Sequence, residues 1–155
     1  MIRIMFVCYG NICRSPMAEF IMKDLVKKKG QSDKFLIKSS ATSSEELGNP
    51  VHRGTRAVLD KMGISYAGKV ATRLKKEDYY NYDYFIGMDY DNVSAMKRIF
   101  GADPENKISM LLDYTSNPHE VADPWWTGDF SATERDVVSG TQALYEYLIN
   151  NKIKK

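Results

Sequence analysis

The stretch from Cys8 to Ser15, with the sequence CYGNICRS, most constrains what this chain can fold into. It follows an apolar run at 1–7, which is typical of a strand buried on both faces. Ser15 and Pro16 then predict the start of a helix, with Ser15 as the N-cap. A loop between a strand and a helix N-terminus directs backbone N–H groups outward, and the helix dipole favours negative charge there. The sequence therefore predicts an anion-binding loop with the Cys8 thiol at its floor.

The rest of the chain alternates between strand and helix patterns. Further strands are predicted at 35–39, 82–88 and 108–112. Helices are predicted at 16–29, from Asn49-Pro50 to about Met62, at 89–100, and after a capping box at Ser131 and Glu134, with a long loop at 113–130 and a polar tail at 152–155. Alternating units favour a parallel, doubly wound sheet. We therefore expect one domain over 1–155, a three-layer α/β fold of Rossmann-like or flavodoxin-like type with a four-stranded parallel sheet flanked by helices.

Composition narrows the class of protein. The net charge of +2 is too small to indicate nucleic acid or an anionic membrane as a partner, and no apolar stretch approaches 18 residues. The only two cysteines, Cys8 and Cys13, both lie in the opening loop. Two cysteines this close cannot cross-link a fold, which favours a reducing compartment and a reactive thiol. We expect a cytoplasmic protein.

The spacing Cys8-x5-Arg14 has a chemical interpretation. Arginine offers a planar fork of donors that matches phosphate oxygens. A cysteine near a helix N-terminus and an arginine is expected to be a reactive thiolate, placed for in-line attack on bound phosphorus. The alternative is an inert cysteine at a strand end and an ordinary arginine at a helix start.

The segment CYGNICRSPMA at 8–18, together with four later segments, resembles the low-molecular-weight protein tyrosine phosphatases. The later segments are SSATS at 39–43, GNP at 48–50, YDYFIGMD at 82–89 and DP at 123–124. The resemblance runs in order from end to end of the chain. It implies an α/β fold with a four-stranded parallel sheet, and phosphomonoester hydrolysis through a phosphocysteine with neither metal nor cofactor.

The resemblance also implies roles for the loop residues. Cys8 would be the nucleophile, and Arg14 would bind the phosphoryl oxygens and stabilise their charge in the transition state. Ser15 would hydrogen-bond the Cys8 thiolate, while Asn11 and Ser39 would support the loop. The phosphate-binding loop as a whole would comprise Tyr9, Gly10, Asn11, Ile12, Cys13, Arg14 and Ser15.

Asp123 supplies the second half of the implied mechanism. A phenolate leaving group has a conjugate acid with a pKa of about 10, so its departure at neutral pH needs a proton donor. Pro124 restricts Asp123 to an extended backbone, which suits a fixed side chain on a long loop. A lone Asp-Pro pair is otherwise most often a turn.

Four aromatic or acidic side chains are predicted to line the substrate cleft. Trp125 and Trp126 stand where the family usually carries two tyrosines, and adjacent aromatics on a polar loop fit a wall that stacks on an aryl phosphate. We expect at least one of them to line the site, while the other packs inward. Tyr9 replaces a common leucine, and Glu45 replaces an aromatic residue, leaving one wall acidic.

Two other departures from the family concern support and specificity. Lys69 falls where some members have a histidine bonded to the loop asparagine, which puts that support in doubt. Ile12 falls where relatives specific for phosphoarginine have threonine, and an apolar residue there favours phosphotyrosine. Phosphotyrosine-containing proteins are the expected partners, with inorganic phosphate and other oxyanions as inhibitors. His52 and His119 are too isolated to predict a metal site.

Other functions remain to be weighed. A thiol-dependent arsenate reductase on the same fold would need cysteines downstream, and none follows Cys13. A catalytically silent phosphate-binding module is not favoured, because Cys8, Arg14 and Asp123 are all present. Cys13 suggests a further hypothesis, in which it traps oxidised Cys8 as a reversible disulfide. The alternative is that Cys13 only packs beneath the loop.

Overall fold

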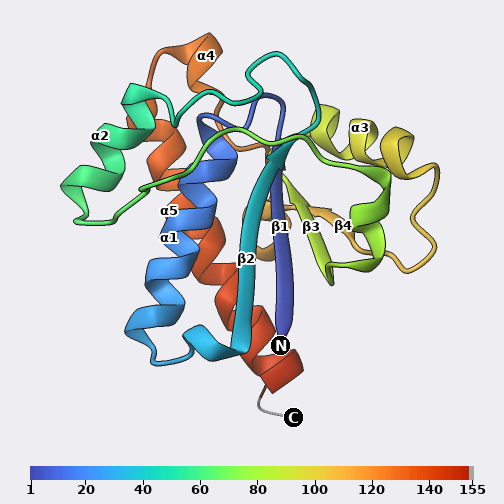
Figure 1. Ribbon diagram of the computed structural model, residues 1–155. Coiled ribbons are helices and arrows are strands. Elements are labelled where there is room, and N and C mark those ends of the chain that lie inside the picture. The colour runs from blue at the N-terminus through green and yellow to red at the C-terminus, as the bar shows by residue number, and fades with distance from the viewer. Residues whose placement is uncertain (154–155) are drawn as a thin grey trace.

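The computed structural model describes residues 1–153 and contains a parallel sheet with helices on both faces (Figure 1). The strands are β1 (Ile2–Cys8), β2 (Phe35–Ala41), β3 (Tyr84–Gly87) and β4 (Ile108–Met110). The helices are α1 (Arg14–Lys28), α2 (Arg53–Lys61), α3 (Tyr90–Phe100), α4 (Pro124–Thr127) and α5 (Phe130–Leu148). Short 3-10 helices span Ser32–Lys34, Lys76–Tyr80 and Leu111–Tyr114, and a π-helical turn spans Ile149–Ile153. The predicted α/β class and four-stranded parallel sheet are confirmed.

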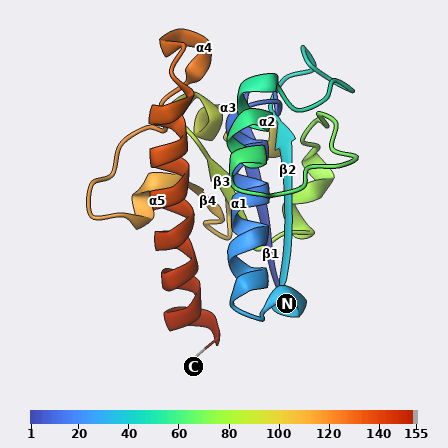
Figure 2. The ribbon, with the colours of Figure 1, turned by 90° about the vertical axis from the view of Figure 1, so that its left-hand side faces the viewer.

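The strand order is β2-β1-β3-β4, and all three pairs are parallel. Helices α1 and α5 cover one face with α2 beside them, as the view onto that face shows (Figure 2). Helix α3 covers the other face, against β3 and β4. The three layers follow from the sequence pattern, because strands buried on both faces need helices on both sides.

Each face of the sheet has its own apolar core. On the α1 and α5 face, Ile4 and Phe6 of β1 are fully buried among helix residues such as Met17 and Leu144. On the α3 face, alternate residues of β1 join an aromatic cluster around Phe85. This alternation assigns the side chains of β1 to the two faces, and Cys8 at the carboxyl end of the strand belongs to the α1 and α5 face.

The starts of α1 and α2 differ from the sequence prediction. Helix α1 begins at Arg14 with Cys13 in the N-cap position, so Ser15 is not the cap, and its hydroxyl contacts Cys8 instead. Helix α2 begins at Arg53, not at Asn49-Pro50, because 49–50 form backbone contacts with the segment at 70–71. His52 caps α2 by accepting a hydrogen bond from the N–H of Gly54.

The carboxyl-terminal part of the chain also differs from the prediction. Strand β4 ends at Met110, and the predicted loop at 113–130 contains the end of a 3-10 helix and the whole of α4. Asp129, not Ser131, caps α5 by accepting hydrogen bonds from the backbone. The chain is still helical at Lys152, where a polar tail was predicted, and residues 154–155 of that tail lie outside the described residues.

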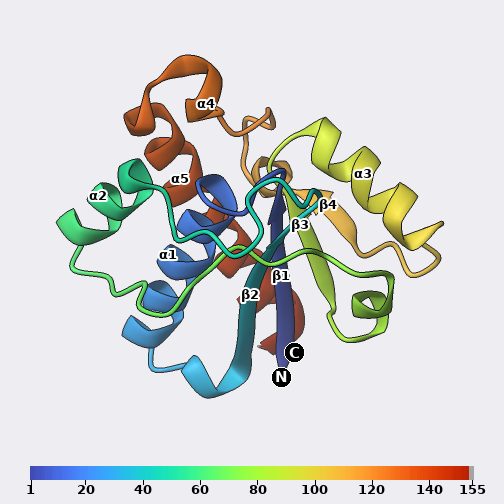
Figure 3. The same cartoon turned by 45° about the horizontal axis from the view of Figure 1, so that its top comes forward.

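The carboxyl ends of the strands gather several loops at one edge of the sheet (Figure 3). The loop after β1 leads into α1, the loop after β3 leads into α3, and α4 lies across from α3 at the same edge. A hydrogen bond from the N–H of Val121 to the carbonyl of Met88 (2.9 Å) joins the segment before α4 to the end of β3. In parallel α/β sheets this edge is where ligands bind. Within residues 1–153 no helix is long and apolar enough to cross a membrane.

Candidate active site

The thiol of Cys8 lies at the end of β1 with two hydrogen-bonding neighbours. Its Sγ is 3.0 Å from Ser15 Oγ and accepts a hydrogen bond from the backbone N–H of Asn11 at 3.2 Å. The side chain of Cys8 is 3% exposed and lines a cleft at the sheet edge. The sulfur therefore has one backbone donor and one hydroxyl within hydrogen-bond distance. The Ser15 hydroxyl and the N–H of Asn11 are therefore placed to hydrogen-bond a thiolate at Cys8.

Asn11 holds the loop in its shape. It adopts a left-handed backbone (φ 61°), which asparagine tolerates better than most residues, and its side chain is almost fully buried. Its amide nitrogen donates to Ser15 Oγ at 2.8 Å and to Ser39 Oγ at 3.0 Å. Its amide oxygen accepts from the backbone N–H of Thr72 at 3.1 Å. The predicted positions of Asn11, Ser15 and Ser39 therefore come together in one network.

A buried carboxylate, Glu19, terminates this network on α1. Ser39 Oγ donates to Glu19 Oε1 at 2.5 Å, and Lys69 Nζ lies 3.6 Å from the same oxygen. Lys69 also donates to the backbone carbonyl of Ser39 at 2.9 Å. Burial, more than any other cause, lowers the pKa of Lys69. Lys69 thus contacts Ser39 and Glu19, while Thr72 is the residue that bonds the oxygen of the loop asparagine.

The guanidinium of Arg14 lies at the first turn of α1 between two carboxylates. Nη1 donates to Asp89 Oδ2 at 2.8 Å, and Nη2 is 3.4 Å from Asp123 Oδ2. Burial by itself would lower the pKa of Arg14, but the negative charges of Cys8, Asp123 and Asp89 raise it above its ordinary value. The arginine is therefore a fixed cation beside the thiol.

Asp123 precedes α4 and caps it, with Oδ1 accepting from the N–H of Trp125 at 3.0 Å. Its side chain is 29% exposed, so the carboxyl group is accessible from the cleft. Trp125 and Trp126 are 71% and 83% exposed, and both line the cleft. The prediction that one tryptophan packs inward is wrong, because a single turn of helix presents both rings at the surface.

The cleft has a volume of about 680 Å³ and contains the predicted loop residues from Cys8 to Arg14 in its lining. Tyr9 and Glu45 form part of one wall, where the Tyr9 hydroxyl donates to Glu45 Oε1 at 2.8 Å. This hydrogen bond raises the pKa of Tyr9. The four predicted cleft residues therefore share one opening.

Cys13 is partly buried at the end of the loop and lines the cleft. Burial, followed by the charge of Cys8, raises the pKa of the Cys13 thiol to about 12. Its backbone carbonyl accepts a hydrogen bond from Thr55 Oγ1 at 3.0 Å. Both cysteines are free thiols in the structure, so the disulfide between Cys8 and Cys13 stays a prediction.

Sequence reasoning missed several residues of the site. Asp89 was predicted only as the start of a helix and as the last residue of the motif at 82–89, yet it caps α3 and also binds Arg14. Its position directly after a strand, at the ligand-binding edge of the sheet, is the signal that could have identified it. Glu19 and Thr72 gave no such signal, because their contacts join segments far apart in the sequence. Among residues 1–153, no cluster of three or more His, Cys, Asp or Glu side chains could hold a metal ion.

A thiol, an arginine and a carboxylic acid around one cleft of a parallel α/β sheet define a cysteine-dependent phosphatase type of site. The model of the protein family described as "Low molecular weight phosphotyrosine protein phosphatase" matches residues 3–154. The chain belongs to this family, as the motifs predicted.

Named relatives support the same assignment. The chain is 39% identical over 146 residues to the low molecular weight protein-tyrosine-phosphatase YfkJ of Bacillus subtilis, covering 93% of this chain and 94% of that protein. The crystal structure of YfkJ superimposes with a TM-score of 0.95, covering 98% of this chain and 97% of the other. The low molecular weight protein tyrosine phosphatase SP-PTP from Streptococcus pyogenes is 40% identical, with a TM-score of 0.85 and 99% and 95% of the two chains covered.

Proposed function

We propose that this protein hydrolyses phosphotyrosine and other aryl phosphate monoesters through a phosphocysteine intermediate, without a metal or cofactor. One observation carries the proposal: Cys8, Arg14 and Asp123 line the same cleft, with the guanidinium of Arg14 3.4 Å from the Asp123 carboxylate. The names of the relatives, which are protein tyrosine phosphatases, agree with it.

In the first step the Cys8 thiolate attacks phosphorus, so that a sulfur–phosphorus bond forms as the bond to the aryl oxygen breaks. Arg14 neutralises charge on the equatorial oxygens, together with N–H groups of the first turn of α1, which have no partner within the helix. Asp123 donates its proton to the departing phenolate, a contribution of about 10²–10⁴-fold to the rate. For this step Asp123 must be protonated in the substrate complex.

In the second step a water molecule attacks the phosphocysteine, and Asp123 accepts the proton of that water. The sulfur–phosphorus bond breaks, releasing inorganic phosphate and returning Cys8 to its thiolate form. The hydrogen-bonding neighbours of Sγ, Ser15 and the N–H of Asn11, stabilise the leaving thiolate. Phosphate and other oxyanions would bind the same loop and act as inhibitors.

The cleft walls support aryl substrates. Trp125 and Trp126 are exposed on one side and Tyr9 on the other, and such aromatic rings stack on a phenyl group. The apolar side chain of Ile12 in the loop favours phosphotyrosine over phosphoarginine. We propose phosphotyrosine-containing proteins as substrates, acted on in the cytoplasm by a single domain that spans 1–155.

The test is hydrolysis of an aryl phosphate in the presence of a chelator, comparing the wild-type protein with Cys8→Ser and Asp123→Asn. Cys8→Ser should abolish turnover. Asp123→Asn should slow a phenol-like leaving group by about 10²–10⁴-fold and slow a strongly acidic leaving group much less. Turnover that survives Cys8→Ser, or that requires a divalent metal, would overturn the mechanism.

A further inference from the structure

The charged residues that line the cleft are mostly acidic. The carboxylates are Glu45, Glu46, Asp89, Asp91 and Asp123, and the guanidinium groups are Arg14 and Arg98. With every carboxyl group ionised, five negative and two positive groups leave a formal charge of −3 before the Cys8 thiolate is counted, and −2 when Asp123 carries the proton that it donates. Beyond the phosphate-binding loop, these acidic groups disfavour a substrate that carries further negative charge and favour one that carries positive charge beside its phosphate.

Two of the five carboxylates contact the arginine that binds the phosphoryl group. Asp89 and Asp123 both lie against the Arg14 guanidinium, at 2.8 and 3.4 Å. Their charges are therefore partly balanced within the protein. Of the other three acids, Glu45 and Asp91 are exposed and Glu46 is half-buried, and none of them forms an ion pair among residues 1–153.

Glu45 and Glu46 form the acidic wall beside the phosphate-binding loop. Glu45 accepts a hydrogen bond from the Tyr9 hydroxyl, and Glu46 accepts one from Asn49 Nδ2 at 2.6 Å, so both carboxylates are held by neutral groups. A Cβ placed on Gly10 would lie 3.3 Å from Cγ of Glu46, which shows how closely this side chain approaches the loop. Among the ion pairs of residues 1–153, neither carboxylate has a partner.

The neighbouring arginines do not neutralise the charge of Glu45 and Glu46 by forming ion pairs with them. Arg73, which reaches the same loop, donates to Ser44 Oγ at 2.7 Å and does not line the cleft. Arg98 lines the cleft from α3, where Asp91 on the same helix opposes it with an equal charge. The rim therefore retains the negative charge of Glu45 and Glu46.

We propose that the acidic wall formed by Glu45 and Glu46 selects phosphotyrosine residues that are flanked by lysine or arginine. The inference deepens the proposed phosphatase function and rests on it. A basic side chain next to the phosphotyrosine pairs with the wall while the phosphoryl group reaches Arg14. Pairs at an exposed rim contribute modestly, at about 1.4- to 5-fold in kcat/KM for each pair, and act chiefly on encounter and discrimination.

The experiment compares three phosphotyrosine peptides of equal length that differ only in the residues flanking the phosphotyrosine. One carries lysines, one alanines and one glutamates. At about 0.01 M salt, kcat/KM should fall about threefold from the lysine to the alanine peptide, and about threefold again to the glutamate peptide. At about 1 M salt, where the Debye length falls to about 3 Å, the three values should converge.

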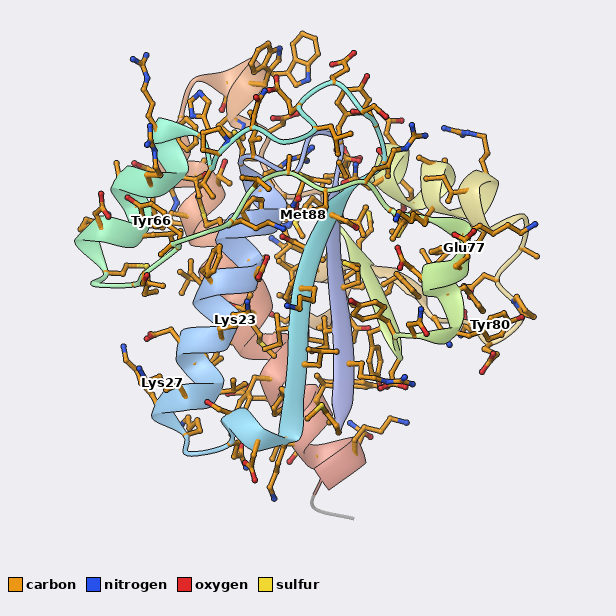
Figure 4. The ribbon with its side chains drawn as sticks, viewed as in Figure 1. Lys23, Lys27, Tyr66, Glu77, Tyr80 and Met88 are labelled. Carbon is orange, nitrogen blue, oxygen red and sulfur yellow. The ribbon has the colours of Figure 1, made fainter. Side chains whose placement is uncertain are left out.

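The double variant Glu45→Gln and Glu46→Gln tests whether these two carboxylates cause the preference for the lysine peptide. Glutamine keeps an oxygen that can accept the bonds from Tyr9 and Asn49, so the variant removes charge while leaving the contacts. It should bring the lysine-to-glutamate ratio close to one and raise kcat/KM for the glutamate peptide. Glu77→Gln is the matched control, because this exposed residue lies beside α3, on the other side of the sheet from α1, and should leave the ratio unchanged (Figure 4).

Equal kcat/KM for the three peptides at low salt would overturn the proposal, as would a lysine preference that persists in the double glutamine variant. Either result leaves the proposed function standing, because all three peptides would still be hydrolysed. Failure to hydrolyse any peptide or a simple aryl phosphate would overturn the proposed function itself. The two failures are therefore distinguishable.

Discussion

Replacing Asn11 by alanine removes the residue on which the shape of the phosphate-binding loop depends. The side chain of Asn11 is 1% exposed and makes hydrogen bonds to Ser15, Ser39 and the backbone of Thr72. Its backbone is left-handed, a conformation that alanine adopts only with strain. We expect a loss of both stability and activity.

The cost can be estimated from these contacts. Three hydrogen bonds at about 1 kcal/mol each contribute about 3 kcal/mol, and the left-handed alanine adds about 1 kcal/mol. The free energy of unfolding should therefore fall by about 4 kcal/mol, a large part of the about 5–15 kcal/mol typical of a domain. The N–H of Asn11 and the hydroxyl of Ser15 both contact the Cys8 sulfur. A change in the loop would displace them, so kcat/KM for an aryl phosphate should also fall in the protein that remains folded.

Urea unfolding measures the stability, with kcat/KM measured on the same samples well below the unfolding midpoint. Asn106→Ala is a matched control, because Asn106 is also left-handed (φ 51°) but exposed. It should cost only about 1 kcal/mol and leave kcat/KM unchanged. The difference between the two variants isolates the buried hydrogen bonds.

The reasoning would be refuted if Asn11→Ala lost no more stability than Asn106→Ala. It would equally be refuted if Asn11→Ala kept the wild-type kcat/KM, since the loop would then hold its shape without this side chain. A change in the urea m-value would show that the two-state comparison does not apply, and thermal unfolding by calorimetry would replace it.

Three further predictions concern the ion pair, the thiols and the core. Asp89→Asn keeps a side chain able to cap α3 but removes the charge that holds Arg14. The value of kcat/KM should therefore fall by about 10- to 100-fold, with little change in melting temperature. Wild-type kinetics would contradict this prediction. Iodoacetamide at neutral pH should label Cys8 well before Cys13, because burial chiefly raises the pKa of the Cys13 thiol to about 12 and keeps it protonated; peptide mass spectrometry showing equal labelling would contradict it. Gly140→Ala should lower stability by about 1–2 kcal/mol, since a Cβ there would lie 2.5 Å from a buried leucine and overpacking outweighs the gain in helix propensity; an unchanged urea midpoint would contradict it.

Local patterns predicted the order and type of most elements. The apolar run before Cys8 became β1, and the alternation of strands and helices became a parallel sheet, because periodicity reports burial directly. The starts of helices were predicted less well. Ser15 fitted the pattern of an N-cap, but its hydroxyl lies against the Cys8 thiol, and the network around Asn11 overrides the local preference.

The sequence by itself determined the chemistry of the loop, since Cys8, Arg14 and the start of α1 are close along the chain and one strand–loop–helix unit positions them. Only the tertiary structure decided what surrounds it. Asp89 and Arg14 are in contact although they lie 75 residues apart in the sequence, and Thr72, whose N–H bonds Asn11, lies 61 residues from it. Such contacts depend on which strands are neighbours in the order β2-β1-β3-β4, and no local spacing encodes that order. The balance of charge at the rim is decided in the same way, because it sums side chains from loops that meet only when the sheet is formed.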